Sequence, residues 1–198
     1  MTETTPTLGT DTDTTQAAGW LRVVPMLAHR WPTWLGLAFA AINLADTGDG
    51  TEFSFLLLLA ASGYLLVAVL DRPRVTWPVL YALVAAVVVL RLFDFDPWPV
   101  LAVVAVLVVA VGLVRGQLRR PGLYALQSPA ALGFIALGLA ALYVPADIGR
   151  YLVAAGLLAH AVWDGIHWRA NKIVARSFAE WCGVLDLVVG LAILMLVH

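Results

Sequence analysis

Charged residues are scarce in this sequence. Asp, Glu, Lys and Arg make up 13% of the 198 residues, whereas hydrophobic residues make up 62%. A soluble domain usually has about 25% charged residues, because polar side chains must cover its surface. This chain has too few of them to cover a soluble fold, so we expect the lipid bilayer to serve as its solvent.

Cysteine and lysine each occur once. The single cysteine, Cys182, excludes an internal disulfide and a cysteine-based zinc knuckle. The single lysine, Lys172, falls in a predicted loop, which excludes a rhodopsin with a retinal-bearing lysine in its last span. Residues 1–19 are rich in threonine and lack the basic start and apolar core of a signal peptide. We predict a disordered tail there and a single transmembrane domain over 20–198.

The remaining sequence predicts seven membrane-spanning helices. Seven apolar stretches each come near the roughly 20 residues that a helix needs to cross a bilayer core. They cover residues 31–48, 53–70, 76–93, 97–115, 123–146, 148–168 and 177–197. Only residues 145–147 divide the fifth stretch from the sixth, so one long kinked helix stays the alternative there. The expected fold is an all-α polytopic membrane helical bundle, with a short interfacial helix over 20–30 before the first span.

The basic residues predict the orientation of this bundle. Lys and Arg collect in cytoplasmic loops. With seven spans, only Arg91 and Arg150 fall on one side of the membrane. The other side holds ten: Arg22, Arg30, Arg72, Arg74, Arg115, Arg119, Arg120, Arg169, Lys172 and Arg176. We therefore expect a protein of the bacterial inner membrane with its N-terminus in the cytoplasm and its C-terminus outside.

We expect the middle of the chain to have mainly a structural role. The third and fourth spans are runs of Val, Leu and Ala, and we expect them to face lipid. In the fifth span, Gln127 and Ser128 precede Pro129, which frees a backbone carbonyl. These polar residues either line a cavity or merely accompany a kink. Small residues in the fifth and sixth spans suit close helix packing: Gly133, Gly138, Ala154 and Gly156.

The sixth span carries three ionisable residues, although such a residue costs about 2.5–3.5 kcal/mol or more at the centre of a bilayer. His160, Asp164 and His167 share one face of the helix, since they are four, three and seven residues apart. A residue of this kind inside a span is a functional candidate by default.

The antiparallel seventh span adds a second set of polar residues. Cys182 and Asp186 share a face, being four apart, and Glu180 is turned away from them by about 120°. Depths counted at about 1.5 Å per residue place His160 level with Asp186, and Asp164 level with Glu180. These depths allow two tiers of pairs between the two spans, although the orientation of Glu180 points it away from the other residues.

Imidazole and carboxylate groups are the usual ligands of zinc, iron and manganese, so the pattern predicts a divalent metal site. The candidate ligands are His160, Asp164, His167, Glu180 and Asp186. One ion cannot easily take both histidines, because they lie about 10.5 Å apart along the helix axis. One alternative is acid–base catalysis or a proton relay through His160, Asp164, His167 and Asp186. The other is plain structural pairing.

The order of these residues resembles a known pattern. The stretch His160-x-x-Trp163-Asp164-x-x-His167-x-x-x-Asn171-x-Ile173, followed by Cys182-x-x-x-Asp186, is similar to a family of uncharacterised bacterial integral membrane proteins. The resemblance covers residues 156–190. This chain departs from it at Trp168 and Leu185, where that family carries a histidine and a cysteine. The resemblance implies a multi-pass membrane protein and no particular activity.

Three functions are consistent with this pattern. The first is a site, open to the cytoplasm, that binds a metal ion or performs acid–base chemistry on a lipid-soluble small molecule. The second is a small transporter or proton-coupled carrier, although the chain is short and shows no inverted repeat. The third is a structural or assembly subunit of a membrane complex. The expected partners are the lipid bilayer and a small molecule, with no nucleic acid; enzymatic activity and oligomeric state stay open.

Overall fold

The computed structural model describes residues 28–45 and 48–196, and these residues form helices and turns without a strand. The predicted tail over 1–19, the interfacial helix up to residue 27, and Arg22 lie outside the described residues. The seven α-helices of the described ranges are α2 (Trp31–Leu44), α3 (Ser54–Leu70), α4 (Thr76–Leu92), α5 (Pro97–Val114), α6 (Leu123–Leu142), α7 (Ala146–Ala170) and α8 (Arg176–Leu196). Short 3-10 turns precede three of them: η1 (Thr51–Phe53), η2 (Pro73–Val75) and η3 (Gln117–Arg119). The all-α prediction is confirmed for the described part of the chain.

Local signals explain where several helices begin and end. The carboxylate of Asp96 accepts the backbone N–H of Trp98 at 3.0 Å and caps α5, with Pro97 at the first helical position. Asp71 and Asn171 end α3 and α7 in the left-handed conformation, with φ of 53° and 48°. Such residues stop a helix because their short polar side chains tolerate this conformation.

Five of the helices are long and apolar enough to cross a membrane, which is consistent with a membrane protein. They are α3 and α4 with their preceding turns, α5, α6 and α8. The other two helices, α2 and α7, are not among these candidate spans, each for its own physical reason. Helix α2 has 14 residues, or about 21 Å of helix, against a hydrocarbon core of about 30 Å. Helix α7 has 25 residues and is long enough, but it carries Asp147, Arg150, Asp164 and Arg169. The count of seven spans therefore stays a prediction.

The fifth and sixth predicted spans are separate helices. Helix α6 ends at Leu142 and α7 begins at Ala146. Pro145 has φ −52° and ψ 140°, an extended conformation that interrupts the helix. Its carbonyl accepts the N–H groups of Ile148 and Gly149 at 2.8 and 2.9 Å, which starts α7 in a new direction. The single kinked helix does not form.

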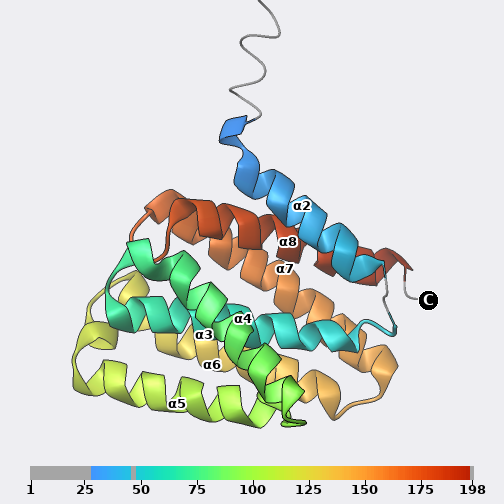
Figure 1. The fold of residues 1–198 in the computed structure, drawn as a ribbon, viewed down its shortest axis with the longest axis horizontal. Coiled ribbons are helices and arrows are strands. Elements are labelled where there is room, and N and C mark those ends of the chain that lie inside the picture. The colour runs from blue at the N-terminus through green and yellow to red at the C-terminus, as the bar shows by residue number, and fades with distance from the viewer. Residues whose placement is uncertain (1–27, 46–47, 197–198) are drawn as a thin grey trace, which may run out of the picture.

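Successive helices run in alternating directions, so that the connections gather at two ends of the bundle (Figure 1). One end, here called the basic end, holds the start of α2 and the connections α3–α4, α5–α6 and α7–α8. It carries nine of the ten basic residues predicted for one side; the tenth, Arg22, lies outside the described residues. The opposite end holds Arg91 and Arg150 together with Asp49, Glu52, Asp94, Asp96 and Asp147.

A polar contact joins two connections at the basic end. Arg120 Nη1 and the Tyr124 hydroxyl each donate to the carboxylate of Asp71 at 2.7 Å. The hydrogen bond from Tyr124 and then that from Arg120 lower the pKa of Asp71 below its usual value. The carboxylate that ends α3 therefore also holds the start of α6.

Helix α3 is the centre of the bundle, and α4 and α5 are its periphery (Figure 1). Of the apolar span that contains α3, 72% is buried, against 11% for the span that contains α4 and 22% for α5. Leu57, Leu58 and Leu65 of α3 are wholly buried, whereas Val103 and Leu107 of α5 are 60% and 58% exposed. The apolar middle spans thus turn most of their side chains outward, as expected of helices surrounded by lipid.

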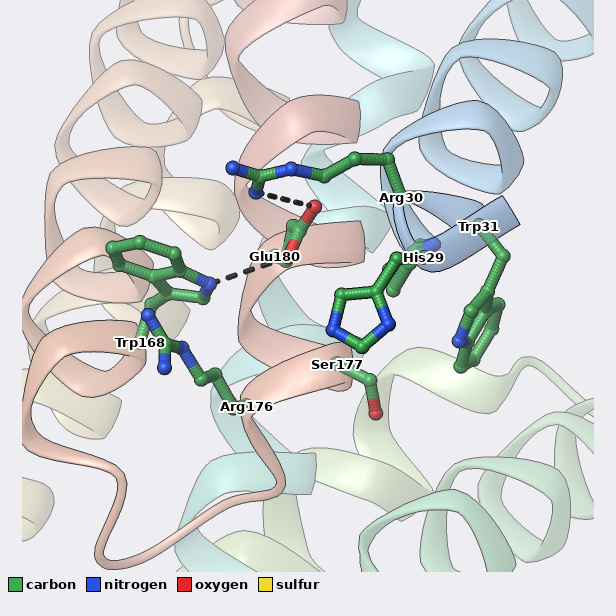
Figure 2. A pocket seen from close by; sticks show the side chains of 8 residues that line it. His29, Arg30, Trp31, Trp168, Arg176, Ser177 and Glu180 are labelled. Atoms are coloured by element: carbon green, nitrogen blue, oxygen red, sulfur yellow. Dashed lines mark hydrogen bonds and ion pairs between the residues drawn. The ribbon is translucent and has the colours of Figure 1, made fainter. Parts of the chain in front are cut away.

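Helix α2 lies against α8 and is held there by Glu180 (Figure 2). The Thr33 hydroxyl donates to Glu180 Oε1 at 2.6 Å, and Arg30 Nη1 lies 3.2 Å from the same oxygen. From the end of α7, the Trp168 indole N–H donates to Glu180 Oε2 at 3.3 Å. One carboxylate therefore joins α2, α7 and α8 at the basic end.

Close helix contacts occur at some of the predicted small residues and not at others. A Cβ on Gly156 would lie 2.6 Å from Leu57 Cδ1, and a Cβ on Gly138 would lie 3.0 Å from the Ser54 carbonyl oxygen. These close approaches confirm the packing role predicted for the two glycines. The packing role predicted for Gly133 is wrong, because a Cβ there would meet no described residue within 4 Å. Gly133 faces a groove between α6 and α7 instead.

We expect Gly149→Ala to destabilise the protein by about 1–3 kcal/mol, the usual cost of overpacking a core. A Cβ on Gly149 would lie 2.5 Å from the backbone carbonyl oxygen of Ala141, which cannot move aside as a side chain can. The matched control is Gly133→Ala, where a methyl group meets open space. Thermal unfolding in detergent checks the pair; equal midpoints for the two variants would contradict the packing argument.

Candidate metal centre

The site forms where α7 and α8 approach each other closely. A Cβ on Gly183 of α8 would lie 3.0 Å from Asp164 Cβ of α7. Two helical turns further on, a Cβ on Gly190 would lie 3.1 Å from Leu158 Cγ. Glycine at these two positions lets the helix backbones come together, as in membrane helix pairs generally. The polar faces of the two helices therefore meet at short distance.

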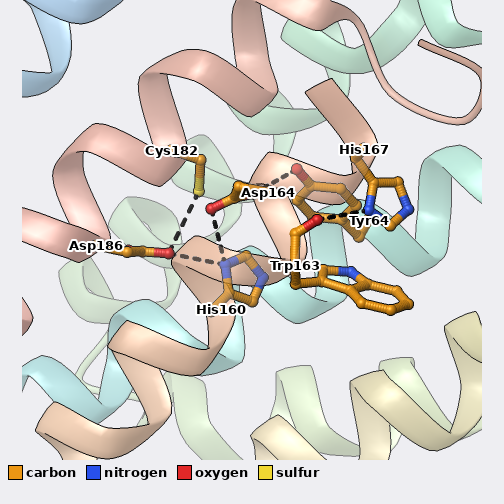
Figure 3. Close-up of polar contacts among 7 residues, drawn as sticks. All are labelled: Tyr64, His160, Trp163, Asp164, His167, Cys182 and Asp186. Atoms are coloured by element: carbon orange, nitrogen blue, oxygen red, sulfur yellow. Dashed lines mark hydrogen bonds and ion pairs between the residues drawn. The ribbon is translucent and has the colours of Figure 1, made fainter. Parts of the chain in front are cut away.

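Four side chains converge between these helices (Figure 3). His160 Nδ1 lies 2.8 Å from Asp186 Oδ2 and 3.2 Å from Asp164 Oδ2, and Cys182 Sγ lies 3.8 Å from Asp186 Oδ2. One ligand-type atom from each of the four residues lies within 4.8 Å of all the others. All four are buried, with at most 3% of each residue exposed. We call this group the cluster.

The structure brings together three of the predicted site residues and adds a fourth. His160 and Asp186 meet as their matching depths suggested. Asp164 joins them because it lies one turn from His160 on the same face. Cys182, noted in the sequence only as sharing a face with Asp186, lies in the cluster for that reason.

The predicted pairing of Asp164 with Glu180 is wrong, and so is Glu180 as a ligand of this site. Glu180 lies on another face of α8, where Arg30, Thr33 and Trp168 occupy its two oxygens. The angular offset of about 120° from Asp186 turns it toward α2 and away from α7. Its role in the structure is to hold helices together.

His167 is buried on the predicted face but lies outside the cluster. Its Nδ1 lies 2.9 Å from the Trp163 carbonyl oxygen, and its Nε2 lies 2.9 Å from Gln127 Nε2. Since a carbonyl accepts and an amide N–H donates, these partners define a neutral ring with its proton on Nδ1. Both nitrogens are thus engaged. The axial rise of about 10.5 Å over seven residues separates His167 from His160.

Sequence reasoning missed Tyr64 of α3. Its hydroxyl donates to Asp164 Oδ1, and the side chain is buried. Its ring packs against the rings of both histidines, with centroids 5.4 Å from His160 and 4.8 Å from His167. The available signal was a single phenol in a strongly apolar span, because a buried tyrosine hydroxyl needs a hydrogen-bond partner.

Positive charge at the centre of the cluster would balance its two carboxylates. The oxygens of Asp164 and Asp186 and the sulfur of Cys182 are negative or electron-rich, and both carboxylates face His160 Nδ1. Protonating His160 on both nitrogens would supply a charge but would leave an imidazolium N–H at Nε2. Among the described residues, that buried nitrogen has no hydrogen-bond partner. A cation bound at Nδ1 leaves the same Nε2–H unpaired, but in a neutral ring. A divalent ion also balances both carboxylates, where an imidazolium balances one, so it suits the site better.

Three of the six distances among these atoms are close to those around a tetrahedral ion. Bonds of about 2.0–2.1 Å to nitrogen or oxygen and 2.3 Å to sulfur place two such ligands about 3.3 Å apart, and sulfur and oxygen about 3.5 Å apart. The corresponding distances here are 2.8 and 3.2 Å for nitrogen to oxygen, and 3.8 Å for sulfur to oxygen. Small side-chain movements would bring all four atoms to one ion. The mixture of imidazole, thiolate and carboxylate ligands is typical of zinc.

A small cavity of about 30 Å³ lies beside the cluster. Cys182 and Asp186 form its polar side, and apolar residues of α3, α4 and α8 form the rest: Leu56, Leu59, Ala60, Leu80, Phe178, Trp181 and Leu185. A volume of at least about 10–15 Å³ is needed to hold one water molecule. The cavity therefore has room for a water-sized ligand next to the side chains of the cluster.

These features define a class: a helical bundle with several apolar helices able to cross a membrane and a buried His/Cys/Asp cluster between two of its helices. Comparison with protein-family models, curated proteins and solved structures finds no match to the chain. The resemblance of residues 156–190 to a bacterial membrane protein family stays a prediction.

Proposed function

We propose that the protein is an integral protein of the bacterial inner membrane with seven spans, its N-terminus in the cytoplasm and its C-terminus outside. The alternating helix directions and the collection of nine basic residues at one end support this orientation. Helix α7 fits among the spans despite its charges. Asp147, Arg150 and Arg169 lie near its two ends, and only Asp164 lies deeper, where it is paired.

Within this bundle, we propose a site for a divalent metal ion, with zinc as the favoured ion. The observation that supports it is the convergence of four buried ligand-type side chains, His160, Asp164, Cys182 and Asp186. Tyr64 orients Asp164 by donating to the oxygen that does not face His160. A hydrogen bond of this kind commonly supports a metal ligand from outside. It also offsets part of the negative charge of the cluster.

The chemistry proposed for the site acts on a small lipid-soluble molecule. Zinc, when bound, lowers the pKa of an attached water molecule to about 7. With four protein ligands, a water molecule would reach the ion only as a fifth ligand or in place of one of the four. The chain contributes the four ligands, the hydroxyl of Tyr64, and the small cavity whose apolar walls exclude bulk water from Cys182 and Asp186. No observation among the described residues favours a carrier or an assembly subunit over this site.

Metal analysis of the purified protein tests the proposal. After exposure to zinc and removal of the excess, we expect about one zinc ion per chain, and less than about a tenth of that in His160→Ala, since a ligand is lost. His167→Ala is the matched control, because it removes a buried histidine of the same helix that lies outside the cluster. Wild-type protein without zinc, or equal zinc loss in the two variants, would refute a metal site at the cluster.

A further inference from the structure

A second cavity, of about 680 Å³, lies at the basic end, away from the cluster (Figure 2). It is bounded by the start of α2, the end of α7 and the first turn of α8. Its polar and aromatic lining includes His29, Arg30, Trp31, Trp168, Arg176 and Ser177. Sites for small organic molecules commonly have volumes of about 300–1,000 Å³. This cavity is therefore large enough for a small organic group and much larger than a bare ion.

The lining carries excess positive charge in a fixed arrangement. Glu180, the one carboxylate among the described residues that line the cavity, pairs with Arg30 at 3.2 Å and accepts the indole N–H of Trp168. The guanidinium of Arg176 stacks over the Trp168 ring, 4.0 Å from its centroid. Among the described residues, Arg176 forms no ion pair within 4 Å. A stacked guanidinium keeps its edge N–H groups available to a ligand.

Further donors lie beside Arg176. Ser177 Oγ accepts the Trp77 indole N–H at 3.1 Å, which leaves the hydroxyl hydrogen to donate. Both residues belong to the first turn of the 21-residue helix α8, whose dipole favours an anion. The N–H groups of Phe178 and Ala179 in this turn already donate to the Ala175 carbonyl, so the dipole and the two side chains are what the helix start offers. Two arginines, a hydroxyl and this helix start together match the chemistry of a phosphate group.

The surroundings point to a phosphate that is attached to a lipid. Trp31 and Trp168 border the cavity at the end of the bundle, and tryptophan prefers the level of lipid headgroups. From there α2 continues with exposed apolar side chains, including Trp34, Phe39 and Ile42. A headgroup in the cavity would leave its acyl chains beside this apolar face.

We propose that the cavity binds the phosphate of an anionic phospholipid, with Arg176 and Arg30 as its main partners. This inference rests on the proposed membrane insertion and is independent of the metal site. The zinc content of each variant distinguishes the two, because a failure here would leave zinc binding at the cluster unchanged.

Lipid binding to the purified full-length chain in detergent tests the proposal. Native mass spectrometry would compare phosphatidylglycerol with diacylglycerol, which lacks the phosphate, and a parallel titration would use inorganic phosphate. We expect saturable binding of phosphatidylglycerol and weak binding of diacylglycerol. Arg176→Gln should weaken phosphatidylglycerol binding by about tenfold or more, the effect of losing one charge-assisted hydrogen bond.

Two further variants keep this test decisive. Arg74→Gln removes an exposed charge at the same end but outside the cavity, and binding should stay unchanged. His29→Glu places a negative charge at an exposed position of the lining, so it should weaken binding even if Arg176→Gln fails to fold. Equal binding of the two lipids, or equal losses in Arg74→Gln and His29→Glu, would overturn the proposal. If the protein bound inorganic phosphate but not phosphatidylglycerol, the ligand of the cavity would be free phosphate and not a lipid headgroup, and the proposal would be overturned.

Discussion

Cobalt-substituted protein is expected to show an intense thiolate-to-metal charge-transfer band in the near ultraviolet, and Cys182→Ser is expected to lose that band completely. Cys182 is the only cysteine in the chain, so a sulfur-to-cobalt band can arise only from this residue. Its Sγ lies in the cluster, 3.8 Å from Asp186 Oδ2. Thiolate and imidazole ligands in a tetrahedral arrangement bind cobalt much as they bind zinc.

The serine variant is chosen because it keeps a small polar side chain at a buried position. Its folded state should persist, and its remaining three ligands should hold cobalt more weakly. Asp147→Asn is the control, because it removes an exposed carboxylate at the other end of α7 and should leave the spectrum unchanged. A cobalt-loaded wild-type protein without the band would place the ion elsewhere and remove Cys182 from the site.

The sequence was sufficient to predict the helices of this fold, since each apolar run is bounded by turn residues. Asp96 with Pro97 marks the start of α5, and Asn171 marks the end of α7. The helical repeat also predicted half of the cluster, because it placed His160 and Asp164 on one face. Depth counting then placed Asp186 opposite His160, at what proves to be 2.8 Å between Nδ1 and Oδ2.

The rest of the site depends on contacts between distant parts of the chain. Tyr64 lies 100 residues before Asp164, and no local pattern relates the two. Glu180 looked like a ligand because an ionisable residue in a span suggests function. Its partners Arg30 and Thr33 are 150 and 147 residues away on a helix whose placement no periodicity reveals. A helical repeat thus identifies the residues that share a face, whereas the packing of α2 and α3 determines which of them form a site.

Replacing His160 with alanine in metal-free protein is expected to destabilise the fold by about 3–5 kcal/mol, as breaking a buried charge pair does. The change leaves two carboxylates, Asp164 and Asp186, facing each other at a buried position without the imidazole between them. Adding Asp186→Asn should restore part of the lost stability, because it removes one of the unpaired charges. Asp164 keeps its hydrogen bond from Tyr64 in the double variant.

Chemical or thermal unfolding of the single and double variants in the presence of a chelator measures this coupling. Residues in contact commonly show interaction free energies of about 0.5–3 kcal/mol, whereas distant pairs are additive within about 0.5 kcal/mol. The combination of His160→Ala with Asp147→Asn is the distant control, since Asp147 is exposed and lies at the opposite end of α7. A double variant His160→Ala/Asp186→Asn that is no more stable than His160→Ala would show that the carboxylates are not ionised in the metal-free fold. Restored stability would instead establish that the cluster holds opposed negative charges, which is the condition that makes it a site for a cation.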